Sequence, residues 1–161
     1  MVRQGHSTFV FLDRIELIDS LIPYFKDILG KTDRILAPES KVFSVQGKST
    51  QDEKDDAKKQ GLICLVTYGC GSKGLSFDNY TAMVIGHPRR NGFLQINNRI
   101  FRLDGPRNKP RVLKYIVDKR TGLKTQYNGF KKALRDEYPQ TIYHESTVNY
   151  DDKKITDDLQ S

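Results

Sequence analysis

The sequence has 161 residues, of which 37% are hydrophobic, and its length is typical of a single domain. Its 27 basic and 20 acidic residues give a net charge of +7, and no apolar run approaches the ~20 residues that span a bilayer. With only two cysteines, Cys64 and Cys70, it is expected to be neither a disulfide-rich secreted domain nor a membrane-spanning protein, and its pattern excludes collagens and coiled coils.

The positive charge is concentrated in one segment. Residues 89–135 contain fourteen Lys or Arg and two acids, for a net charge of +12, whereas the rest of the chain carries −5. Such a segment indicates a polyanionic partner, either nucleic acid or nucleotide phosphates. The alternative is an ordinary solvated face.

The first sixty residues alternate between short apolar runs, which predict buried strands, and longer segments that predict helices. Strands are expected at residues 8–12 and 42–45. Between them, apolar residues recur at helical spacing; Pro23 weakens the middle of that helix and Gly30 ends it. A charged helix that ends at Gln60 follows the second strand, with Ser or Thr at its cap position.

The same alternation continues through the second half. In chain order we expect a strand at 62–67, a glycine-rich loop at 68–77, a strand at 81–86, a helix at 92–103, a strand at 111–117 and a basic helix at 124–137. Strands that alternate with helices predict an α/β fold with a parallel sheet of about five or six strands flanked by helices. We expect one folded domain at residues 1–138 and a polar, disordered tail at residues 139–161.

Residues 69–74 fit the dinucleotide-binding pattern G-x-G-x-x-G after a strand. The fingerprint belongs to the first strand of its unit, however, and needs an acidic residue about 20 positions later, where this chain has Arg89 and Arg90. The P-loop pattern is also missing from this sequence. We therefore do not expect NAD or FAD. A plain flexible loop and a loop whose backbone N–H groups approach phosphates both remain open.

The octapeptide at residues 95–102 places three polar side chains on one face of a helix. Gln95 and Arg99 are four residues apart, and Arg99 and Arg102 are three apart. Two stacked guanidinium groups beside an amide can hold a phosphate by forked, charge-assisted hydrogen bonds. The alternative is an amphipathic helix with solvated arginines.

In this order, the pieces resemble the second RecA-like domain of superfamily 2 helicases and translocases, over most of the chain. Residues 8–12 look like motif IV, and residues 42–47 look like the strand and glycine that follow it. Residues 67–77 look like motif V. Residues 95–102 look like motif VI, Q-x-x-G-R-x-x-R, with Asn98 in place of the family glycine. The length of motif V is most similar to UvsW-type phage recombination helicases and Snf2-like DNA translocases, which favours DNA over RNA.

The resemblance implies a role for each matching residue. It implies that Arg102 is the arginine finger and that Arg99 is a second contact to the γ-phosphate of ATP. The other implied contacts are Gln95, Gly74 and Ser76 for ATP, and Thr67, Tyr68 and Gly69 for nucleic acid.

The resemblance also implies a two-domain motor. ATP and Mg²⁺ would bind between this domain and an N-terminal RecA-like domain of the parent protein. This sequence has no Walker A lysine motif and no acidic magnesium motif, and the acids near residue 55 look solvated. We therefore expect no metal site and no ATP hydrolysis by this chain alone, and an intracellular location in a bacterium, a virus-infected cell or a nucleus. The alternative is a nucleic-acid-binding RecA-like module without an ATPase role.

Overall fold

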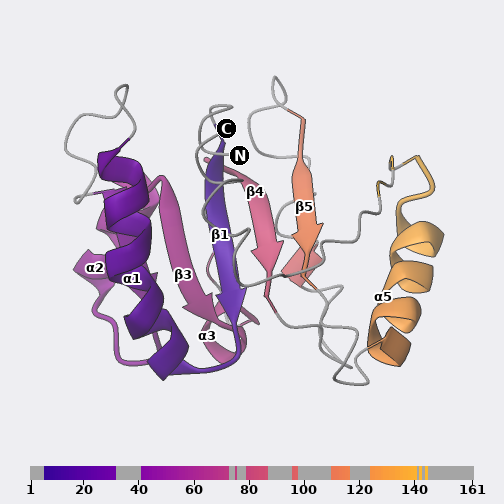
Figure 1. Cartoon of the computed structure of the whole chain (residues 1–161), viewed down its shortest axis with the longest axis horizontal. Helices are drawn as coiled ribbons and strands as arrows, with labels where there is room; N and C mark the ends of the chain where they lie inside the picture. The colour runs from indigo at the N-terminus through magenta and orange to yellow at the C-terminus, as the bar shows by residue number, and fades with distance from the viewer. Residues whose placement is uncertain are drawn as a thin grey trace, which may run out of the picture.

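Five parallel strands form one sheet in the computed structural model, which describes residues 6–31, 41–72, 75, 79–86, 96–97, 110–116, 124–140, 142 and 144. The strands are β1 (Ser7–Leu12), β2 (Val42–Val45), β3 (Ile63–Thr67), β4 (Tyr80–Ile85) and β5 (Val112–Tyr115). Their order across the sheet is β2-β3-β1-β4-β5. Figure 1 shows β1 in the centre, between β3 and β4. The prediction of an α/β fold with a parallel sheet is confirmed.

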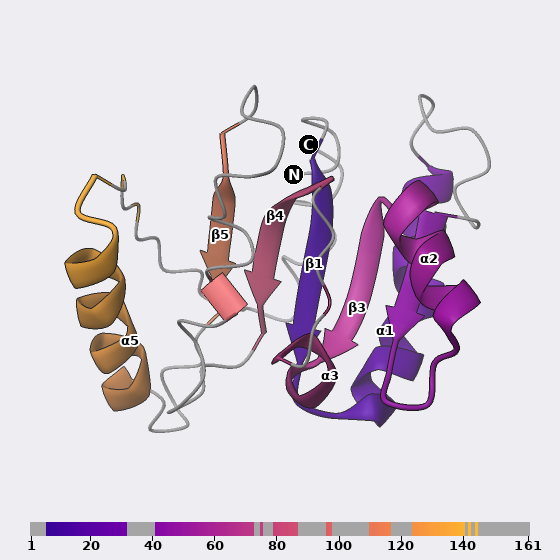
Figure 2. The same ribbon diagram turned by 180° about the vertical axis from the view of Figure 1, so that it is seen from behind.

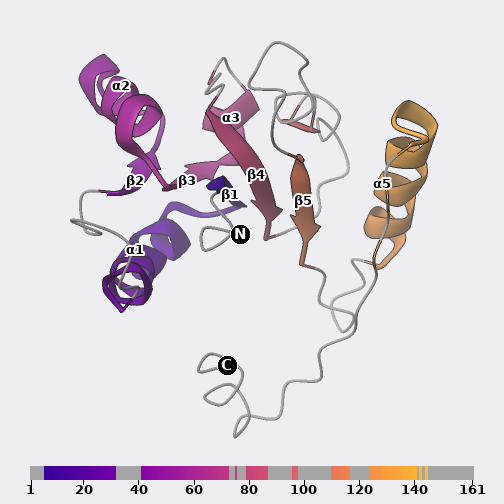
Figure 3. The ribbon, with the colours of Figure 1, turned by 90° about the horizontal axis from the view of Figure 1, so that it is seen from above.

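Helices lie on both faces of the sheet. Helix α1 (Ile15–Gly30) covers one face, and α2 (Gln51–Gln60) with the short α3 (Tyr68–Ser72) covers the other, as Figures 2 and 3 show. Helix α5 (Lys124–Glu137) lies beyond β5 (Figure 1). This arrangement follows from right-handed crossovers, because the connection from β1 to β2 runs across the sheet in the opposite direction to the connections from β2 to β3 and from β3 to β4.

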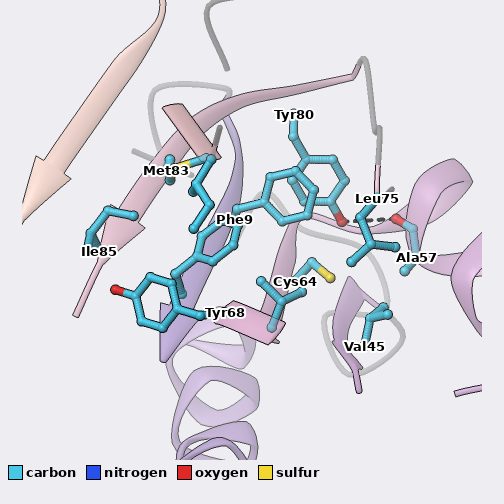
Figure 4. Close-up of a cluster of buried hydrophobic side chains, with 12 residues drawn as sticks. Phe9, Val45, Ala57, Cys64, Tyr68, Leu75, Tyr80, Met83 and Ile85 are labelled. Atoms are coloured by element: carbon cyan, nitrogen blue, oxygen red, sulfur yellow. Dashed lines mark hydrogen bonds between the residues drawn. The ribbon is translucent and has the colours of Figure 1, made fainter. Parts of the chain in front are cut away.

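The alternation of side chains along β1 divides the interior into two clusters. Phe9 and Phe11 point toward α2 and α3, whereas Val10 and Leu12 point toward α1. Figure 4 shows the larger cluster, which Tyr68 and Tyr80 join from the ends of their elements. Both faces of each central strand are therefore buried, which explains why these strands are continuous apolar runs in the sequence.

Tyr80 reaches the larger cluster because the register between β1 and β4 shifts at Ser7 and Thr8. Without that shift, strict alternation would put Tyr80 on the face opposite Met83 and Ile85. Its ring stacks on Phe9 with 4.3 Å between ring centroids, and its hydroxyl donates a hydrogen bond to the backbone oxygen of Ala57, 2.9 Å away (Figure 4). The register shift thus lets Tyr80, at the start of β4, form a hydrogen bond with α2.

One prediction about secondary structure is wrong: the expected loop at residues 68–77 begins with a helical turn, α3, whose first residue, Tyr68, packs into the core. The helix expected between the first two strands is confirmed, since α1 contains Pro23 and ends at Gly30. The predicted basic helix is confirmed with bounds Lys124–Glu137. Most of the helix expected at 92–103 and most of the tail at 139–161 lie outside the described residues, so the domain boundary stays a prediction.

Candidate functional site

The first residues assigned to motif V lie where the carboxyl ends of the central strands meet. Thr67 is the last residue of β3 and pairs with Leu12, the last residue of β1. On the other side of β1, the backbone N–H of Gly86 donates to the oxygen of Phe11 at 3.0 Å. In parallel α/β sheets, ligands bind outside the carboxyl ends of the strands. Thr67 therefore lies at the carboxyl end of the parallel strands, where a binding site is expected.

The three residues predicted to contact nucleic acid differ in exposure. Thr67 is half-buried, and Gly69 is exposed with no atom within 4 Å of the position a Cβ would take. Tyr68, by contrast, is only 3% exposed, and its ring lies 5.7 Å from that of Phe11. The Tyr68 ring is thus a core group, and its backbone is the part of this residue that a strand of nucleic acid would meet.

Gly71, in the same segment, has a packing role. A Cβ atom at this position would lie 2.2 Å from Cε1 of Phe11 and 2.9 Å from its Cζ. Only glycine lets the backbone of α3 approach this ring, so one of the glycines in the pattern G-x-G-x-x-G is explained by the core.

The neighbouring Cys70 is an ordinary thiol. Burial raises the pKa of its thiol group, and nearby Lys54 only partly opposes this effect. Because the thiolate is the reactive form, raising the pKa lowers the reactivity of the group at neutral pH. The environment of Cys70 therefore does not favour nucleophilic chemistry.

The segment assigned to motif VI is anchored in the core by two residues. Ile96 is 3% exposed and belongs to the larger cluster, and the neighbouring Asn97 is completely buried. The Oδ1 atom of Asn97 accepts a hydrogen bond of 2.9 Å from the hydroxyl of Tyr115, the last residue of β5. Both predicted motifs are thus attached at the carboxyl ends of strands.

Sequence reasoning missed the roles of Asn97 and Tyr115. The available signal was a polar residue directly after Ile96 and a tyrosine in an apolar strand, two residues that each need a partner when buried. The other predicted site residues, Gly74, Ser76, Gln95, Arg99 and Arg102, lie outside the described residues.

Gln46, the residue after β2, orders a turn at the same edge of the sheet. Its backbone N–H donates to Oγ of Ser49 at 3.0 Å, and its Nε2 donates to Oδ1 of Asp19 at 3.3 Å. This turn leads into Thr50, the cap of α2. The segment at residues 42–47 therefore contacts α1 through Asp19 and leads into α2, at the carboxyl end of the strands.

The comparisons with known proteins connect this geometry to helicases. No family model matches this sequence. One similar curated protein is named "Putative ATP-dependent RNA helicase QP509L", from African swine fever virus (isolate Pig/Kenya/KEN-50/1950); it is 29% identical over 141 residues, which cover 84% of this chain and 26% of the relative. The protein of the same name from isolate Tick/South Africa/Pretoriuskop Pr4/1996 is 36% identical over 78 residues, which cover 48% of this chain and 15% of the relative.

A solved structure has the same fold. The crystal structure of the C-terminal part of Fun30 ATPase domain matches with a TM-score of 0.61 and 12% sequence identity, over 79% of this chain and 40% of that chain. The chain has the fold of a C-terminal RecA-like helicase domain. The resemblance inferred from the motifs and the RecA-like fold predicted from the sequence are confirmed.

This RecA-like domain spans about a quarter of the length of the curated relatives, 26% in the first case. Among the residues that the structure describes, no three His, Cys, Asp or Glu side chains gather into a metal site. No described helix is long and apolar enough to cross a bilayer. The closer likeness to UvsW-type helicases and the preference for DNA stay predictions.

Proposed function

We propose that this chain is the C-terminal motor domain of an ATP-dependent helicase or translocase. The observation that carries the proposal is the attachment of both motif segments at one edge of the sheet: Thr67 ends β3, and Asn97 bonds the last residue of β5. The name of the viral relatives, ATP-dependent RNA helicase, supports the same class of activity.

In this proposal the arginines act on the phosphates of ATP. Arg102 is the arginine finger, Arg99 is the second contact to the γ-phosphate, and Gln95 supports them. A positioned guanidinium stabilises the charge that develops on a transferring phosphoryl group, and such a group contributes ~10³–10⁵ in rate. Gly74 and Ser76 lie near the nucleotide or couple it to the nucleic acid.

Nucleic acid runs past the end of β3, in contact with Thr67, the Tyr68 backbone and Gly69. The exposed position of Gly69 supports this path, because a glycine has no Cβ and lets another chain come close to its backbone. The motif V length favours DNA, whereas the relatives are named RNA helicases. Competition between duplex DNA and RNA of the same sequence decides between the two substrates.

The motor needs a second domain. The sequence has no Walker A lysine motif, so we propose that an N-terminal RecA-like domain of the parent protein supplies that lysine and the acidic residues for Mg²⁺. A protein of this kind works inside a cell. The competing function is a nucleic-acid-binding module in which Arg99 and Arg102 contact the backbone of the nucleic acid instead of ATP.

Substituting Arg102→Ala in the intact parent protein separates the two functions. The motor proposal predicts loss of nucleic-acid-stimulated ATP hydrolysis by roughly 10³-fold with nucleic-acid affinity retained. Phosphate release and fluorescence anisotropy measure the two properties. Lys59→Ala, which removes an exposed positive charge on α2, is the matched control and is expected to keep its ATPase activity.

Two outcomes would contradict the motor proposal. One is loss of nucleic-acid binding with ATP hydrolysis unchanged in Arg102→Ala, which is the result that the module function predicts. The other is robust ATP hydrolysis by the purified 161-residue chain, because a domain without the Walker A motif is expected to be inactive alone.

A further inference from the structure

Asn97 is a buried amide inside an apolar cluster. It is 0% exposed, next to Ile96 of the larger hydrophobic cluster. Its Oδ1 accepts the hydrogen bond from Tyr115, and its Nδ2 is buried without a hydrogen-bond partner in the part of the chain that the structure describes. Burial of an amide costs free energy unless its groups are paired, so the residue is not explained by stability alone.

The hydroxyl of Tyr115 is the donor of this hydrogen bond, and its surroundings keep it protonated. Burial raises the pKa of its hydroxyl far above the usual value; the bond to Asn97 partly opposes this effect, and nearby Tyr68 and Tyr127 add to it. The hydroxyl therefore stays protonated at every physiological pH. The ring is held by α5, since its centroid lies 3.9 Å from that of Phe130 and 6.5 Å from that of Tyr127.

The bond links three parts of the molecule that are far apart in sequence. Tyr115 ends β5, its ring contacts α5, and its hydroxyl holds Asn97. In the sequence, Asn97 is two residues from Gln95 and two residues from Arg99. An apolar side chain in this place would pack without a preferred direction, whereas a hydrogen bond fixes the rotation of the backbone that carries it.

We propose that the Tyr115–Asn97 hydrogen bond sets the orientation of the segment that carries Gln95 and Arg99, and so aligns it with ATP. This inference rests on the proposed function of that segment. Tyr115 and Asn97 are positioning residues, because they act through the arginine-bearing backbone and not on the nucleotide. Helix α5, which buries the Tyr115 ring, is thereby part of the same support.

The test compares Tyr115→Phe, Asn97→Leu and the double variant in the intact parent protein. Tyr115→Phe is expected to lower kcat for ATP hydrolysis roughly tenfold to a hundredfold, because small displacements of a reacting group have effects of this size. KM for ATP and nucleic-acid affinity are expected to stay unchanged, as for a contact that matters mainly in the transition state. Tyr127→Phe, which removes a neighbouring hydroxyl, is the matched control and is expected to keep full kcat.

The double variant separates positioning from packing. Removing both polar partners together is nearly neutral for stability, so its melting temperature should return toward that of the parent protein. Positioning predicts that kcat nevertheless stays low. If kcat recovers together with the melting temperature, or if Tyr115→Phe keeps full kcat while its melting temperature falls, the hydrogen bond only stabilises the fold and the proposal is wrong. If Tyr115→Phe does not fold, the double variant still decides.

Arg102→Ala, measured in parallel, distinguishes failure of the positioning role from failure of the proposed function. If Arg102→Ala abolishes ATP hydrolysis and Tyr115→Phe leaves kcat unchanged, only the positioning role fails. If Arg102→Ala leaves ATP hydrolysis intact, the proposed function fails, and the positioning role falls with it.

Discussion

At the residue scale, glycines mark the places where an aromatic ring needs room. A Cβ at Gly61 would lie 2.0 Å from the hydroxyl oxygen of Tyr80, and one at Gly71 would collide with the ring of Phe11. Both rings are nearly fully buried, so neither can move aside without disturbing the larger cluster. The glycine-rich character of the motif V segment is therefore partly a packing requirement.

We expect Gly71→Ala to reduce the free energy of unfolding by about 1–3 kcal/mol, the usual cost of overpacking a core. Urea denaturation of the 161-residue chain measures the effect. The matched control is Gly69→Ala in the same helix, where a Cβ meets no atom within 4 Å and alanine favours the helix. Equal stability of the two variants would show that the Phe11 contact does not limit this position.

At the scale of elements, α2 depends on its two ends because it buries little. Ala57 is its buried residue, and most of its other side chains are exposed. At the start, Thr50 and Glu53 form a capping box, with bonds of 3.3 and 2.8 Å. At the end, backbone oxygens accept from the Tyr80 hydroxyl and from Nδ2 of Asn79. The helix is thus held by its caps more than by an apolar face.

Removing the Thr50 cap of α2 is therefore expected to lower the stability of the whole domain. Thr50→Ala is expected to lower the free energy of unfolding by about 1 kcal/mol, whereas Thr50→Ser keeps the hydroxyl and should be nearly neutral. Thermal denaturation followed by circular dichroism compares the two variants. A Thr50→Ala chain as stable as Thr50→Ser would mean that water replaces the lost bond at no cost.

At the scale of the whole molecule, the described part of the basic segment lies on one side of the sheet. The described part of the basic segment belongs to β5 and α5, at one end, while α2, with its first-turn acids Asp52 and Glu53, lies at the other (Figure 1). Contacts between Lys or Arg and phosphates supply most of the affinity for nucleic acid that is independent of sequence. Nucleic acid that contacts Thr67 and Gly69 is thus expected to extend across the sheet toward α5.

Lys132→Glu on α5 should weaken the binding of an oligonucleotide to this chain and reduce the salt dependence of the binding constant by about one ion. Lys59→Glu, an equally exposed change on α2, should alter neither property. Anisotropy titrations at several KCl concentrations measure both. A larger effect from Lys59 than from Lys132 would mean that the bound nucleic acid extends from β3 toward α2 and not toward α5.

The strands were predictable because both of their faces are buried. A continuous apolar run, such as residues 62–67, has one interpretation when a glycine precedes it and a polar loop follows. The bulge that turns Tyr80 toward α2 was not predictable, since a register shift leaves no mark on the composition of a strand. Helix α3 was missed because its two glycines disfavour a helix, and tertiary packing of Tyr68 outweighs that preference.

The candidate site was predictable in part. The spacing of Gln95, Arg99 and Arg102 identifies a face of a helix, but the structure describes only Ile96 and Asn97 of that segment. The sequence alone did not identify Tyr115 as the partner of Asn97, because the two residues are eighteen positions apart. Long-range pairing of two polar side chains depends on the complete fold.

The central position of β1 has a consequence for the order of folding. β1 lies between β3 and β4, and its Thr8 pairs with Ile63 on one side and with Ala82 on the other. β1 is therefore fully paired only after both of these later segments have joined it. Strands that pair with distant parts of a chain close late, because the entropy of a large loop has to be overcome first. Until those pairs form, Phe9 and Phe11 lie on an unpaired apolar strand, and strands of this kind favour aggregation while a protein folds.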